Sequence, residues 1–171
     1  MPLGPEPYTT SWDLTRRPIA GIFVGDFSGS LDVSRGGGVD WSMQPPGSRQ
    51  YFLVENRQKI SYDAGLPGCG ILVWHIDESS AGNGNDARRL VGLAQADGRN
   101  DLNPPYGQAG NSGDAGDVFA GRVHESSFDA ASKPSSNLNG GAASGVTLTR
   151  LGAACGSAAL TLNVKMAGAA K

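Results

Sequence analysis

The residues best suited to chemistry form a tract rich in aspartate and asparagine. Asp97 and Asp101 open this tract, and Asn111, Asp114 and Asp117 close it, with glycines between them. Calcium binds six to eight oxygens from carboxylates, amide carbonyls and backbone in irregular loops. Glycines permit the sharp turns that aim several oxygens at one point. The tract therefore predicts a calcium site formed by these five residues.

The spacing of the acids differs from that of an EF-hand. Arg99, Leu102 and Gln108 occupy the third, sixth and twelfth positions of a loop that would start at Asp97, where an EF-hand needs Asp or Asn, glycine and glutamate. The alternative for the same residues is a set of Asx turns and loop caps that hold no ion. A long segment without regular structure is uncommon in a compact domain unless it is functional. Both interpretations are open at this stage.

His75 is one of two histidines and lies two positions before Asp77 in an apolar segment. In a strand, side chains two positions apart share one face, so this pair suits two ligands of a zinc ion. No HExxH motif is present, however, and a lone histidine in an apolar strand is typically a hydrogen-bonded core residue. We expect His75 to be structural.

Glu55 and Arg57 share one face of another apolar segment. Buried charges must be paired, because an isolated charge is costly to remove from water. We therefore predict a structural role for Glu55 and Arg57, either as an ion pair with each other or through a link to Asp77 across the sheet.

The elements that must position these side chains are mainly β-strands. Two apolar segments rich in β-branched and aromatic residues predict adjacent antiparallel strands, and two segments near the end alternate with period two. The predicted strands cover residues 19–24, 30–33, 50–60, 70–77, 145–151 and 158–164, and residues 87–96 favour a strand over a helix. The stretch 36–47, rich in glycine and proline, indicates hairpins or loop. The expected fold is mainly β, an antiparallel sheet or sandwich with long Gly/Asp-rich loops.

Composition and charge exclude several classes of protein. The chain has 171 residues with 26 glycines, 10 prolines and a net charge of −2, and 12 of its 16 acidic residues are aspartates. The absence of a Lys/Arg cluster argues against nucleic acid as the main partner. No apolar run is long enough for a membrane span, and residues 1–17 show no signal peptide. Cys69 and Cys155 are either a disulfide or two small buried thiols.

Seven segments, taken in order, are similar to a known family. They are YFLVENRQ (51–58), YDAGLPGCGILVWHIDE (62–78), RLVGLAQADG (89–98), DL (101–102), GDAGDVFAG (113–121), the F…S.PSS element (128–136) and SGVTL (144–148). Together they resemble the later half of the peptidase domain of immune inhibitor A-type secreted zinc metallopeptidases.

The resemblance implies a bacterial or archaeal, exported endopeptidase that acts on proteins, uses zinc and is often stabilised by calcium. In that family the HExxH helix, with two zinc ligands and the general base, precedes the matching block. These residues are absent here, so no catalytic residue carries over, and the upstream half of the domain would be the partner of this chain. Gln95 departs from the family, which has an acid before Ala-Asp-Gly, and this puts the metal site or an ion pair in doubt.

The resemblance divides the chain into three parts. Residues 1–48 form a poorly matched lead-in of short strands and loops, 49–166 form the β-rich C-terminal part of a metallopeptidase-like domain, and 167–171 form a frayed tail. We expect a non-catalytic portion of a secreted peptidase. The alternative is a stand-alone β-rich extracellular binding or adhesion module.

Overall fold

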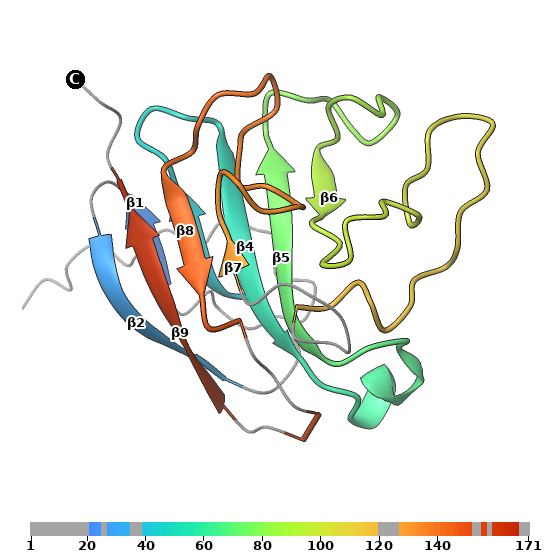
Figure 1. The fold of residues 1–171 in the computed structure, drawn as a ribbon, viewed down its shortest axis with the longest axis horizontal. Coiled ribbons are helices and arrows are strands. Elements are labelled where there is room, and N and C mark those ends of the chain that lie inside the picture. The colour runs from blue at the N-terminus through green and yellow to red at the C-terminus, as the bar shows by residue number, and fades with distance from the viewer. Residues whose placement is uncertain are drawn as a thin grey trace, which may run out of the picture.

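The computed structural model describes residues 21–24, 27–34, 39–119, 127–151, 155–156 and 159–167. Two sheets lie face to face, one of five strands and one of four (Figure 1). The prediction of a mainly β fold is confirmed. The lead-in before residue 19 and the tail after residue 167 lie outside the described residues. The one described helix is a single short turn, so none of the described helices is long and apolar enough to cross a membrane.

The five-stranded sheet has the order β1-β3-β4-β5-β6. Its strands are β1 (Gly21–Val24), β3 (Val39–Gln44), β4 (Gln50–Arg57), β5 (Gly70–Asp77) and β6 (Val91–Leu93). The pairing of β1 with β3 is parallel, and all the other pairings are antiparallel. This one parallel pair departs from the predicted antiparallel arrangement.

The four-stranded sheet is antiparallel throughout and has the order β2-β9-β8-β7. Its strands are β2 (Phe27–Ser34), β7 (Ser127–Phe128), β8 (Val146–Thr149) and β9 (Ala159–Met166). The two strands predicted near the end of the chain are therefore present as β8 and β9. The first three strands contribute to both sheets, so the described part of the expected lead-in, from residue 21, joins the same fold as the rest.

Strands β4 and β5 form the hairpin that the sequence predicts. Their register runs from Gln50 opposite Asp77 to Arg57 opposite Gly70. A short 3-10 helix, η1 (Ser61–Gly65), lies in the connection. Six of the eight residues in each of the two strands are buried.

Strand β3 was not predicted, and β6 is shorter than predicted. The sequence VDWSMQ of β3 stands between glycines and a Pro-Pro-Gly turn, which are local signals for loop. Pairing with β4 and burial of Met43 in the core outweigh these signals. Only Val91–Leu93 pair within the predicted strand over 87–96.

The core lies between the two sheets. Phe52 and Val54 of β4 and Ile71 and Val73 of β5 face buried residues of the other sheet, such as Leu148. Alternate residues of a strand point to opposite faces, so one face of each sheet fills this space. Packing in this core holds β4 and β5 in place, and the long loops are attached to this part of the sheet.

A disulfide joins the two sheets at one end of the sandwich. Cys69, at the start of β5, is bonded to Cys155, in the turn before β9, across 86 positions of sequence. Beside it, the backbone N–H of Gly156 donates a 2.7 Å hydrogen bond to the side chain of Gln58. Of the two alternatives for the cysteines, the structure shows the disulfide.

The disulfide predicts a measurable contribution to stability. Replacing both cysteines (Cys69→Ala with Cys155→Ala) should lower the free energy of unfolding by about 2–5 kcal/mol, because a long loop in the unfolded chain is no longer closed. Urea unfolding followed by circular dichroism measures this. A reductant should produce the same loss in the native chain and no change in the variant. Equal midpoints for the native chain with and without reductant would contradict the assignment.

Candidate metal site

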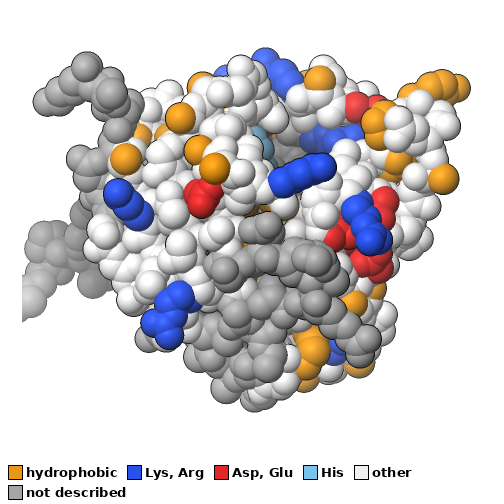
Figure 2. Space-filling model, viewed as in Figure 1, with side chains coloured by type: hydrophobic (Ala, Val, Ile, Leu, Met, Phe, Trp, Pro, Cys, Tyr) orange, Lys and Arg blue, Asp and Glu red, His pale blue; other side chains and the backbone are white. Residues whose placement is uncertain are grey.

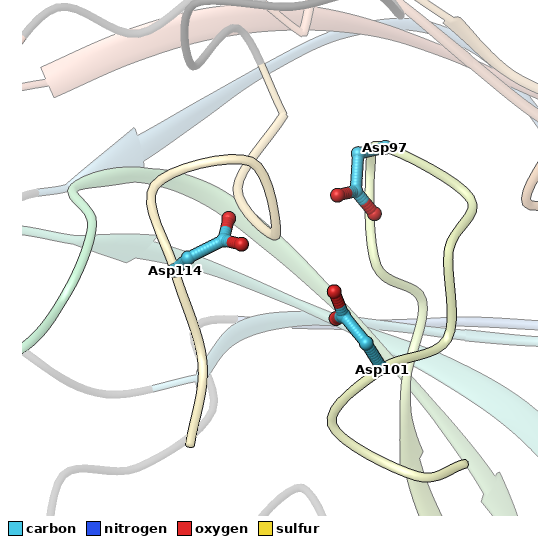
Figure 3. Close-up of side chains that lie close together, drawn as sticks. All are labelled: Asp97, Asp101 and Asp114. Carbon is cyan, nitrogen blue, oxygen red and sulfur yellow. The ribbon is translucent and has the colours of Figure 1, made fainter. Parts of the chain in front are cut away.

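Three of the predicted calcium ligands converge in the loops that follow β6. Each of Asp97, Asp101 and Asp114 offers a carboxylate oxygen, and these oxygens lie within 4.8 Å of one another. Figure 3 shows the three side chains pointing from two neighbouring loops toward one shared space. All three residues are half-buried. This is the geometry in which several oxygens can bind one cation.

The turns that aim these carboxylates are set by local hydrogen bonds. Asp97 Oδ1 accepts the N–H of Arg99 at 3.0 Å, and Asp114 Oδ1 accepts the N–H of Gly116 at 2.6 Å. These are Asx turns, in which a side chain replaces a backbone acceptor. The predicted Asx turns and the predicted clustering of acids therefore occur in the same residues.

Gly116 is required by the closeness of the carboxylates. A Cβ at this position would lie 2.9 Å from Asp114 Oδ1 and 3.0 Å from Asp97 Oδ2. Cβ atoms are essentially never found within 3.0 Å of another atom, so a side chain at this position would displace the carboxylate of Asp114 and crowd that of Asp97. The glycine thus allows acids from two loops to approach each other.

Asp117 adds a fourth carboxylate, which is almost fully buried. It is 4% exposed, and its Oδ2 accepts the backbone N–H of Asp114 at 2.7 Å. Burial raises the pKa of Asp117, the bond from Asp114 partly offsets this, and the negative charges of Asp114, Asp97 and Asp101 raise it further. The four acids therefore form one electrostatic group.

Two buried oxygens of this group have no hydrogen-bond donor. Within the described part of the chain, Asp101 Oδ1 and Asp117 Oδ1 are the only buried side-chain polar atoms without a partner. A buried carboxylate oxygen without a donor is costly, because it loses its bonds to water. These oxygens fit a cation of the calcium type, which prefers hard oxygen ligands.

Among the described residues, a single ion pair reaches the carboxylates of this group. Arg99 reaches Asp97 Oδ2 at 3.5 Å, but the side chain of this arginine is 71% exposed. An exposed pair of this kind contributes little. The donor set contains no sulfur or imidazole, so it suits calcium better than zinc.

Asn111 lies beside the acids in a supporting position. Its Oδ1 accepts the N–H of Gly113 at 2.8 Å, and its Nδ2 donates to Asp114 Oδ2 at 3.2 Å. The amide nitrogen that faces the acid is a donor and cannot bind a cation. In this geometry Asn111 orients Asp114.

Gln95 forms a hydrogen bond to the loop that carries Asp101. It is buried, and its Oε1 accepts the backbone N–H of Leu102 at 3.1 Å. Its Nε2 lies 3.4 Å from Asn100 Oδ1. An acid in this place could also accept the bond from Leu102, but glutamine does so without adding a fifth negative charge.

The structure also pairs Glu55 with Arg57 but places Asp77 elsewhere. Arg57 Nη2 donates to Glu55 Oε2 at 2.8 Å, and Trp74 Nε1 donates to the same oxygen at 3.1 Å. Of the two predicted alternatives, the structure shows the ion pair, and the link to Asp77 is not formed. Asp77 lies opposite Gln50 at the other end of the hairpin, and Glu55 projects from the opposite face of the sheet.

Asp77 instead holds two loops to the end of β5. It is fully buried and accepts bonds from Ser79 N–H at 3.0 Å, Arg88 Nη2 at 3.2 Å and Asn139 Nδ2 at 3.0 Å. Burial raises the pKa of Asp77, but the bonds from Asn139, Ser79 and Arg88 outweigh this and lower it to about 2. Arg88 and Asn139 were not predicted as partners of Asp77, because no sequence motif links either residue to Asp77.

His75 lies near Asp77, and no third His, Cys, Asp or Glu side chain of the described residues completes a metal site with them. Its Nε2 is 3.1 Å from Gln50 Oε1, and burial lowers its pKa although the charge of Asp77 opposes this. Among the described residues, the aspartate cluster is the one group of three or more His, Cys, Asp or Glu side chains that could share an ion. The expectation of a structural His75 agrees with this position.

Comparisons with protein-family models, with curated proteins and with solved structures found no significant match to this chain.

The lowered pKa of Asp77 predicts a dependence of stability on pH. The ordinary pKa is 3.8 and the folded value is about 2, so the charged form stabilises the fold above pH 3.8 and this contribution is lost as the pH falls toward 2. The shift corresponds to about 2 kcal/mol. Asp77→Asn should lower the free energy of unfolding at neutral pH by at least this amount and reduce its loss in acid.

Urea unfolding at a series of pH values measures both effects. The matched control is Asp86→Asn, which removes a surface ion pair with Arg89 and should cost at most about 1 kcal/mol. Equal acid sensitivity of the native chain and Asp77→Asn would contradict the assigned network.

Proposed function

We propose that this chain is a calcium-stabilised, non-catalytic β scaffold. The observation that carries the proposal is the pair of buried, unpartnered oxygens of Asp101 and Asp117 within a group of four carboxylates. An ion bound by Asp97, Asp101 and Asp114 would neutralise most of the negative charge around Asp117 and would supply a partner for the unpartnered oxygen of Asp101. It would also tie the segment around Asp97 to the segment around Asp114.

We further propose that the scaffold is the C-terminal part of an immune inhibitor A-type peptidase domain, with proteolysis in the complete protein. The resembling segments support this, because they coincide with parts that form one unit here. They cover β4, β5, the loops with the acidic group and β8. In this proposal the zinc-binding helix belongs to another part of the domain. The scaffold completes the sheet and holds the loops beside it.

Secretion belongs to the same proposal. The disulfide between Cys69 and Cys155 is compatible with an oxidising compartment. Free calcium is also abundant outside cells, where sites of modest affinity are filled.

Calcium should raise the melting temperature of the purified chain. An ion that binds only the folded state stabilises it by mass action, by about 2.7 kcal/mol at a concentration 100 times Kd. For a chain of this size this corresponds to a rise of roughly 5–10 °C over the value in chelator. Differential scanning calorimetry measures the shift. An unchanged melting temperature at millimolar calcium would contradict the proposal that the chain binds calcium.

Asp101→Asn distinguishes a metal ligand from a structural residue. In chelator the variant should melt at the native temperature or higher, because one repelling charge is gone. In calcium it should lose most of the stabilisation, because one charged ligand is gone. The matched control, Asp63→Asn in η1, has the same change of charge away from the acids and should keep the full calcium response. Equal destabilisation of Asp101→Asn with and without calcium would indicate a purely structural role.

The purified chain should show no zinc-dependent cleavage of casein, because the 171 residues contain no HExxH motif. A fluorescent casein assay at several zinc concentrations measures this, with an active zinc peptidase as the positive control. Cleavage that requires zinc and is abolished by a chelator would contradict the non-catalytic assignment.

A further inference from the structure

A pocket of about 180 Å³ opens between the two sheets at the side where β6 and β7 are the edge strands. Phe52, Ala94 and Phe128 contribute apolar walls, and His75, Arg89 and Ser135 contribute polar groups. Figure 2 shows the hollow on this face, with a histidine side chain visible inside it. An apolar cavity of about 150 Å³ is known to hold benzene, so this pocket has room for one aromatic ring.

Gly92 of β6 keeps the pocket open. It lies opposite His75, so a side chain at position 92 would point between the sheets. A Cβ added there would meet no atom within 4 Å, and the φ angle of Gly92 lies outside the left-handed region. Neither backbone strain nor close packing therefore requires glycine. A glycine within a strand weakens the strand and often marks the approach of a ligand or another backbone.

The outer edge of β6 offers a place for a backbone to bind. Along an antiparallel strand, residues that bond to the neighbour alternate with residues whose N–H and C=O face away. Ala94 donates to Val73 of β5, so the adjacent Leu93 faces away. Val91 also faces away, and both of its polar groups bond to the side-chain amide of Asn83 at 2.9 Å. An amide thus already occupies one position of this edge, and the backbone N–H and C=O of Leu93 form no hydrogen bond with any described residue.

We propose that β6 binds an extended peptide whose backbone pairs with Leu93 and whose aromatic side chain enters the pocket beside Gly92. A peptide residue opposite Gly92 projects on the same face as position 92, which is the face toward the pocket. Addition of a strand to an exposed sheet edge is a common mode of peptide recognition, in which pockets for alternate side chains give specificity. The polar groups of His75 and Ser135 make tyrosine the best-matched side chain.

A titration with two peptides tests the proposal. The ¹⁵N-labelled full chain, oxidised and in calcium, is titrated with acetyl-Ala-Ala-Tyr-Ala-Ala-amide and with the same peptide carrying alanine in place of tyrosine. Backbone amide signals of residues 91–94 should shift with the tyrosine peptide. The alanine peptide should bind at least about tenfold more weakly, because no ring fills the pocket.

Gly92→Leu provides the matched variant. Its side chain should fill the pocket, keep the native melting temperature and abolish the peptide-induced shifts, whereas Gly65→Leu, at an equally open glycine in η1, should bind like the native chain. The comparison of the two peptides needs no variant and decides the question if Gly92→Leu does not fold. Absence of shifts, equal binding of both peptides, native binding by a folded Gly92→Leu, or p-cresol binding as tightly as the tyrosine peptide would each overturn the proposal. The pocket shares no residue with the acidic group, so failure of the calcium proposal leaves this one intact.

Discussion

The mutual repulsion of four carboxylates is the constraint on which the arrangement of the long loops depends. Asp97, Asp101, Asp114 and Asp117 are held together at partly or fully buried positions, where water screens their charges poorly. Isolated loops would separate such charges. The fold must therefore hold the loops by other contacts, and the described structure shows what those contacts are.

Those contacts lead back to the hairpin of β4 and β5. The N–H of Ala94 donates to Val73 of β5 and the N–H of Phe119 donates to Ile71 of β5, both at 2.9 Å, so both ends of the acidic segment are fixed to the sheet. The N–H of Ala96 donates to Asp117 at 3.1 Å and joins the two ends to each other. The disulfide at Cys69 lies two residues from Ile71 and fastens the start of β5 to the other sheet. In this arrangement a cation at the acids would complete an already anchored frame, and it would not have to order the loops from a disordered state.

The sequence predicts the parts of this frame that depend on local pattern, and it misses those that depend on tertiary contact. The apolar runs of β4 and β5 and the alternation in β8 and β9 are sufficient to identify these strands, and glycines between aspartates identify the acidic loops. Strand β3 was not predicted, because the residues on either side of it are typical of loops and the strand is stabilised by its pairing with β4. Asn139 binds Asp77 across 62 positions, and no local pattern contains that information. The sequence around Gly92 does not indicate a role for this glycine either, because the open space beside it is formed by residues distant in the sequence.

The central claim is that the acidic group binds one calcium ion. Isothermal titration of the oxidised chain, stripped of metal, tests it most directly, with the Asp101→Asn variant titrated in parallel. The account predicts one calcium per native chain, with binding lost or greatly weakened in the variant. No heat of binding at millimolar calcium, or equal affinity of the native chain and the variant, would contradict it.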